Sequence, residues 1–140
     1  PLKKMSKSET AAGHAVALLD PPGVIRKKIL RATTDSSPAV DYSALGPGVE
    51  NLLNIFQAFS GWTDSQMQGH FSGLRYGDLK KQVAEMVISH LEPFQKRYHD
   101  IVSEPGYLDR VLRDGAARVA PIANDTVELV KRRMGLYVPS

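Results

Sequence analysis

Apart from one adjacent pair, apolar residues recur every three or four positions between residues 79 and 101, and this spacing constrains the fold more than any other feature of the chain. Side chains with this spacing lie on the same side of an α-helix, because one turn takes 3.6 residues. The stripe consists of Leu79, Val83, Met86, Val87, Leu91, Phe94, Tyr98 and Ile101. The pattern predicts a long helix from Asp78 onwards that turns one face towards a core.

A second apolar stripe follows Pro105-Gly106 and predicts another long helix that ends near Gly135. Small residues in its middle would let a neighbouring helix approach closely. The stripe consists of Leu108, Val111, Leu112, Ala116, Val119, Ala123, Val127 and Val130.

Two shorter helices are predicted ahead of the long ones. The first covers residues 49–60 and is followed by Gly61, because glycine readily adopts the left-handed conformation that ends many helices. Thr63 can cap the second, which runs to about Phe71. Trp62, between them, is interpreted as a hydrophobic plug rather than a platform for stacked bases. The residues expected inward from the first helix are Leu52, Leu53, Ile55, Phe56 and Phe59.

A short apolar run and a basic helix precede these elements. Residues 16–19 could form a buried strand, although a helix can carry the same short run. Asp20 is predicted to cap the helix that follows, with proline in its first turn. The basic residues of that helix are Arg26, Lys27, Lys28 and Arg31. They either contact phosphates of a nucleic acid or form an ordinary solvated face.

Length and composition fit a globular protein of one domain, or of a small domain with an attached fragment, and the helical patterns predict a mainly α fold. The chain has 140 residues, of which 42% are hydrophobic and 24% charged. It has no cysteine, and its four histidines lack the spacing of metal ligands, so we predict neither disulfides nor a bound metal. No apolar run approaches the roughly 20 residues of a membrane span. We expect a cytoplasmic helical bundle of four or five helices that does not enter a membrane.

The chain begins with a motif suited to anions, Lys4-Met5-Ser6-Lys7-Ser8. Lysine supplies positive charge and serine supplies hydroxyl donors, which are the groups that phosphate oxygens accept. The formal net charge is +3, and the basic excess lies in residues 1–48, with seven Lys/Arg against four acidic residues. A polyanion would therefore be met mainly near this end.

The five residues of that motif read KMSKS, the second signature loop of class I aminoacyl-tRNA synthetases. Later segments, taken in order, resemble the C-terminal part of the bacterial tryptophanyl-tRNA synthetases. These segments are Leu18-Leu19-Asp20, Lys27-Lys28-Ile29, Thr34-Asp35-Ser36, Gly48-Val49-Glu50-Asn51-Leu52-Leu53-Asn54-Ile55, Tyr76-Gly77-Asp78-Leu79-Lys80, Leu91-Glu92-Pro93, Leu112-Arg113-Asp114-Gly115-Ala116 and Met134-Gly135-Leu136.

The resemblance implies a ligase that activates tryptophan with ATP, accompanied by Mg²⁺, and transfers it to tRNA(Trp). Its signature loop, here Lys4, Met5, Ser6, Lys7 and Ser8, would bind ATP. Lys7, assisted by Lys4, would be catalytic, because positive charge stabilises the leaving pyrophosphate.

The resemblance also implies a division of the chain. Residues 1–20 would be the signature loop and an adjoining strand, a remnant of a nucleotide-binding α/β domain, and residues 21–140 a helical anticodon-binding domain. The family's His-x-Gly-His signature and tryptophan pocket are absent. We therefore expect a fragment without its N-terminal part, in which ATP and tryptophan would bind through the missing domain. The parent would be a homodimer, and the fragment inactive and monomeric.

Two alternatives stay open at this point. The chain could be a non-catalytic helical module that binds RNA or protein and retains the loop as a relic. It could also belong to a tyrosine-specific relative, because the pocket that selects the amino acid is not in the chain.

Overall fold

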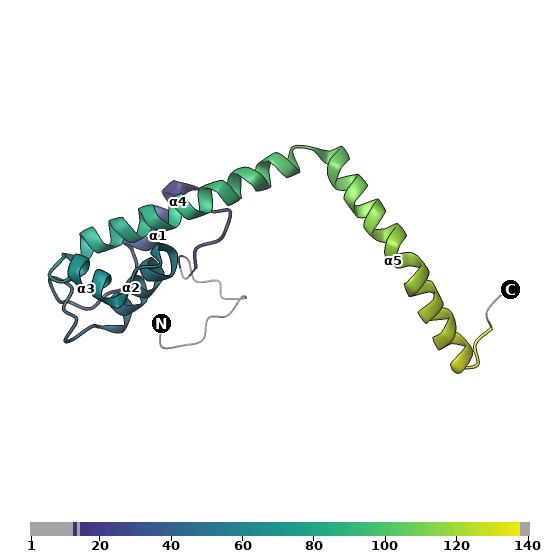
Figure 1. The fold of residues 1–140 in the computed structure, drawn as a ribbon, viewed down its shortest axis with the longest axis horizontal. Coiled ribbons are helices and arrows are strands. Elements are labelled where there is room, and N and C mark those ends of the chain that lie inside the picture. The colour runs from purple at the N-terminus through teal and green to yellow at the C-terminus, as the bar shows by residue number, and fades with distance from the viewer. Residues whose placement is uncertain (1–12, 14, 138–140) are drawn as a thin grey trace. The chain divides into compact units, whose positions relative to one another are not determined.

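The computed structural model describes residue 13 and residues 15–137. Five α-helices account for most of this range, and the only β-type pairing within it is an isolated bridge between Ala39 and Arg75. The mainly α prediction is therefore confirmed. The helices are α1 (Pro22–Leu30), α2 (Pro47–Ser60), α3 (Asp64–Phe71), α4 (Tyr76–Val102) and α5 (Pro105–Arg133), as labelled in Figure 1.

The chain divides into two compact units between Gln95 and Lys96. In the first unit, α1, α2 and α3 gather beside the first part of α4 (Figure 1). They enclose one hydrophobic core, because each helix turns its apolar side to the others. The buried residues are Ile25, Ile29, Val40, Val49, Leu52, Leu53, Phe56, Met67, Phe71, Leu79, Val83, Ala84 and Val87.

Aromatic rings make the centre of this core. Phe56 of α2 and the fully buried Phe71 of α3 meet edge to face, with ring centroids 4.9 Å apart. Trp62 packs edge-on against Phe56 at 5.3 Å and is half-buried. Its position at the junction of α2 and α3 supports its interpretation as a hydrophobic plug.

The boundary between α2 and α3 follows the local rules that the sequence predicts. Gly61 ends α2 in the left-handed conformation, at φ 66°. Thr63 then begins α3 with a capping box, in which its hydroxyl accepts from the Gln66 backbone N–H at 3.4 Å. In return, the Thr63 N–H donates to the Gln66 side chain at 2.9 Å.

The start of the first helix differs from the prediction in two respects. Pro21, not Asp20, occupies the N-cap position of α1, and none of the described side chains caps the helix. Residues 16–19 form no strand and instead run through a turn. The turn closes because the Ala17 and Asp20 backbones hydrogen-bond at 3.0 Å and the Asp20 carboxylate accepts from the Ala17 N–H at 2.8 Å.

The loop between α1 and α2 is tied to the starts of two helices. The Tyr76 hydroxyl, in the first turn of α4, donates to the Asp35 carboxylate at 2.7 Å. At the start of α2, a Cβ on Gly48 would overlap the Thr33 carbonyl oxygen. This close approach explains a glycine at position 48.

The long apolar stripes are buried over a smaller part of their length than predicted. On α4 the burial ends in the region of Leu91, and Phe94 is 47% exposed. Phe59 of α2, also expected inward, is 38% exposed. The second unit contains α5 as predicted, with Gly135 beyond its end at φ 73°, but none of its residues is buried.

Candidate nucleic-acid interface

The predicted ATP-binding residues Lys4, Met5, Ser6, Lys7 and Ser8 lie outside the described residues. The predicted nucleic-acid residues all lie on or directly after α1 and can be placed. Ile25 and Ile29 of α1 are buried against the core, so the basic side chains between them project away from it. The structure divides these four basic residues into two groups.

Arg26 belongs to the contact between α1 and α4. Its Nε donates to Glu85 Oε1 at 2.7 Å, and a terminal nitrogen donates to Oε2 at 3.0 Å. This two-point geometry is the one that matches a guanidinium to a carboxylate. The same hydrogen bonds raise the pKa of Arg26 and lower the pKa of Glu85. Arg26 is thus already engaged within the protein.

Lys28 is also paired, but it remains next to open space. Its Nζ donates to Asp20 Oδ2 at 2.6 Å, and both side chains are largely covered, at 24% and 16% exposed. The hydrogen bond from Lys28 lowers the pKa of Asp20. Asp20 therefore stays ionised through the neutral range and neutralises Lys28.

Lys27 and Arg31 are exposed and form no ion pair within the described part of the chain. Both line an open cavity of about 490 Å³ beside the C-terminal half of α1. The other lining residues are Gly13, Val24, Lys28, Ala32 and Thr33. The cavity thus brings three basic side chains together with a threonine. Such a set offers charge and hydrogen-bond donors to phosphate oxygens.

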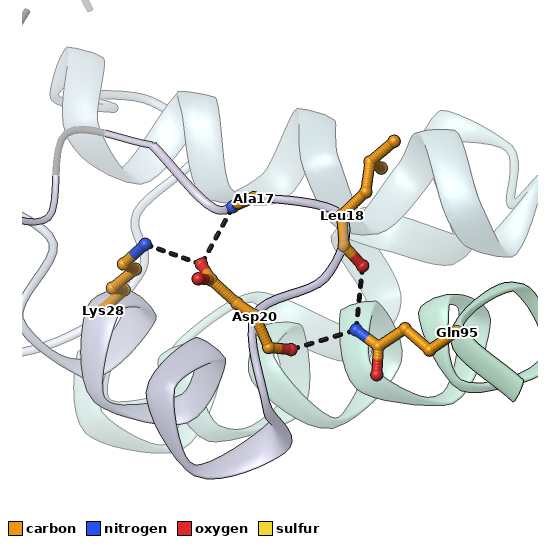
Figure 2. A network of polar contacts seen from close by, with 5 residues as sticks. All are labelled: Ala17, Leu18, Asp20, Lys28 and Gln95. Carbon is orange, nitrogen blue, oxygen red and sulfur yellow. Dashed lines mark hydrogen bonds and ion pairs between the residues drawn. The ribbon is translucent and has the colours of Figure 1, made fainter. Parts of the chain in front are cut away.

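A polar network joins the segment before α1 to α4, and Figure 2 shows it. The Gln95 Nε2 donates to the Leu18 carbonyl at 2.8 Å and to the Asp20 carbonyl at 2.9 Å. On the other side of Asp20, its carboxylate holds Lys28 and the Ala17 N–H. Sequence reasoning missed Gln95 and Glu85, because neither belongs to a local motif and their partners lie at least 59 residues away.

Other polar features of the described residues are less suited to chemistry. A cavity of about 210 Å³ between α2 and α3 has Tyr42 and Asp64 among its lining residues. Burial raises the pKa of Tyr42, whose hydroxyl meets no hydrogen-bond partner among the described residues. Across residues 13 and 15–137, no group of three or more acidic, histidine or cysteine side chains could hold a metal ion. None of the described helices is both long and apolar enough to cross a membrane.

Comparison with known proteins identifies the family. Residues 1–92 match the family of "tRNA synthetases class I (W and Y)". The tryptophan–tRNA ligase of Wolinella succinogenes is 46% identical over 136 residues, which cover 97% of this chain and 42% of that protein. The tryptophan–tRNA ligase of Listeria monocytogenes serovar 1/2a is 43% identical, over 97% of this chain and 41% of that protein. The tryptophan–tRNA ligase of Clostridium tetani is 38% identical, over 99% of this chain and 41% of that protein.

The match to this family covers about two thirds of the chain. The chain therefore belongs to the W and Y family of class I tRNA synthetases. Relatives named tryptophan–tRNA ligase align with nearly all of it. The chain spans about two fifths of the length of these relatives.

Proposed function

We propose that this chain is the C-terminal part of a tryptophan–tRNA ligase, an enzyme that activates tryptophan with ATP and transfers it to tRNA(Trp). One observation carries this proposal: the tryptophan–tRNA ligase of Wolinella succinogenes aligns with 97% of the chain at 46% identity. On this assignment, residues 1–20 contribute to the ATP site and residues 21–140 form the helical tRNA-binding domain.

The ATP step needs positive charge where the pyrophosphate leaves. Lys7 and Lys4 of the signature motif supply it, and Ser6 and Ser8 add hydroxyl donors to the phosphate oxygens. ATP enters with Mg²⁺ as a substrate complex. In the complete gene product we expect Lys7→Ala to lower kcat for adenylate formation roughly 10²- to 10³-fold, because one charge-stabilising group is removed. The affinity for tryptophan should stay close to that of the wild type.

The test is ATP–pyrophosphate exchange by the complete gene product, with tryptophan and with tyrosine in parallel. Exchange that depends on tryptophan supports the proposal. Exchange that depends on tyrosine would move the chain to the other branch of the family. No exchange with either amino acid would favour a non-catalytic binding module.

The 140-residue chain alone should show no exchange, and light scattering of both proteins should find a dimeric parent and a monomeric chain. We expect the parent to work in the cytoplasm.

Within the helical domain, we assign tRNA phosphate contacts to Lys27 and Arg31. Both line the cavity beside α1, whereas Arg26 is held by Glu85 through two hydrogen bonds. Each phosphate contact that is lost should reduce the slope of log K against log salt by about one unit. Lys27→Ala and Arg31→Ala should each do so when tRNA binding is measured across a salt series.

Arg26→Ala is the matched control on the same helix. It should leave the salt slope near the wild-type value, because the guanidinium already faces a carboxylate. If all three variants change the slope equally, the division of the basic residues into two groups is wrong. If none does, the face is only solvated.

A further inference from the structure

The Gln95 side chain holds two backbone carbonyls at once. Its amide nitrogen has two N–H groups, and they reach the carbonyls of Leu18 and Asp20 at 2.8 and 2.9 Å. These partners lie 77 and 75 residues earlier in the chain (Figure 2). The contact therefore binds α4 to the backbone of an irregular segment, regardless of that segment's side chains.

Asp20 holds the same segment from its other side. Its carboxylate accepts from the Ala17 N–H at 2.8 Å and from Lys28 Nζ at 2.6 Å. The segment is thus closed on itself by one hydrogen bond and attached to α1 by an ion pair. With Gln95 on α4, residues 17–20 are fixed to two helices of the first unit.

Apolar burial contributes only part of this attachment. Leu18 is 59% exposed and Leu19 is 42% exposed, so neither leucine of the segment is fully buried. A loop backbone is usually held by buried side chains or by hydrogen bonds. No side chain of residues 17–20 is buried, so the hydrogen bonds are the main attachment. Loss of the Gln95 donors should therefore free the segment locally and leave the core intact.

This segment begins nine residues after Ser8, the last residue of the signature motif, because it starts at Ala17. We propose that Gln95, with Asp20 and Lys28, is a positioning residue of the ligase, which holds the chain that leads out of the signature motif against the helical unit during the ATP step. The inference rests on the proposed function. Gln95 lies far from the motif in sequence and is not assigned to touch ATP. Its effect on catalysis would pass through the backbone of residues 17–20.

The experiment compares three variants of the complete gene product. Gln95→Met removes both donors and keeps an unbranched side chain. Gln95→Lys restores a donor that can reach the carbonyls. Lys96→Met makes a similar change at the neighbouring residue, which pairs with Asp100 at the surface. Hydrogen exchange of residues 15–20 reports on the attachment, and ATP–pyrophosphate exchange reports on catalysis.

We expect Gln95→Met to speed hydrogen exchange of residues 15–20 about tenfold, while the amides of α2 and α3 keep their protection. Its kcat for pyrophosphate exchange should fall about 10- to 100-fold, because a reacting group displaced by about 1 Å loses that much. KM for tryptophan should be unchanged. Gln95→Lys should recover most of the rate, and Lys96→Met should behave as wild type.

Unchanged hydrogen exchange in Gln95→Met would show that the hydrogen bonds do not hold the segment. Faster exchange with an unchanged kcat would show that Gln95 holds the segment without positioning the motif. If Gln95→Met also loses protection in α2 and α3, Asp20→Asn provides a second test from the other side of the segment, with the same expected result. A wild-type protein without tryptophan-dependent activity would overturn the proposed function and this role with it, whereas the hydrogen-exchange result would still report on the attachment.

Discussion

Gly48, the second residue of α2, lies so close to the Thr33 carbonyl oxygen that no Cβ fits between them. The neighbouring atoms are backbone, so they cannot move aside as a flexible side chain could. We predict that Gly48→Ala lowers the free energy of unfolding by about 1–3 kcal/mol, the usual cost of forcing an extra methyl into packed structure. Urea denaturation followed by circular dichroism measures this change.

Gly69→Ala is the matched control for that substitution. Gly69 lies inside α3, and a Cβ there would meet nothing within 4 Å. Because glycine weakens a helix interior, this variant should instead gain roughly 0.5–1 kcal/mol. Equal effects of the two substitutions would contradict the close approach at Thr33.

The capping box at the start of α3 should contribute measurably to stability. Thr63→Ala removes the hydroxyl that accepts from the Gln66 N–H. Loss of such a cap costs about 1 kcal/mol. Ser65→Ala, two residues further on and in the same first turn, should change the free energy of unfolding by much less. Denaturation of the two variants side by side checks the difference, and an equal loss would show that the cap contributes nothing specific.

Asp20 should make part of the stability of the first unit depend on pH. The usual pKa of an aspartate is about 3.9. The hydrogen bond from Lys28 holds the pKa of the Asp20 carboxyl below that value. Folding then favours the ionised form, so the contribution is complete above the unfolded pKa and is lost as pH falls through the folded one. The free energy of unfolding should fall less steeply below about pH 4 in Asp20→Asn than in the wild type.

The pair between Arg26 and Glu85 should respond to a reversal of charge. Arg26→Glu alone places two carboxylates together and should lower the denaturation midpoint. The double variant Arg26→Glu with Glu85→Arg should recover part of the loss. Both side chains are about half exposed, so the difference between the single and double variants should shrink in high salt. A double variant no better than the single one would show that the pair does not couple α1 to α4.

Local rules were enough to predict much of the fold. The Thr63 cap, the left-handed Gly61 and the buried positions of α4 as far as Val87 each depend on residues within a turn or two of one another. Such patterns can be read from the sequence because the helix period and the capping geometry are local. The same local view misplaced Asp20, which would suit an N-cap but is used by Lys28 and Ala17.

For the candidate nucleic-acid interface, the sequence predicts which residues are basic but not how each of them is paired. The sequence shows Arg26 and Lys27 as neighbours of equal charge, but their different surroundings depend on Glu85, which lies 59 residues after Arg26. Gln95 gave no signal, because a single glutamine on a helix says nothing about which carbonyls it will meet. The extent of burial on α4 and α5 was also not predictable, since an apolar stripe does not specify what covers it.

Lys28 belongs both to the cavity beside α1 and to the ion pair with Asp20. An anion in the cavity and the Asp20 carboxylate therefore compete for one ammonium group. Thermodynamic linkage makes this competition reciprocal. The factor by which a bound anion weakens the ion pair equals the factor by which the ion pair weakens the affinity for the anion. Occupancy of the cavity beside α1 is thus coupled to the turn at residues 17–20 through the ammonium group of Lys28.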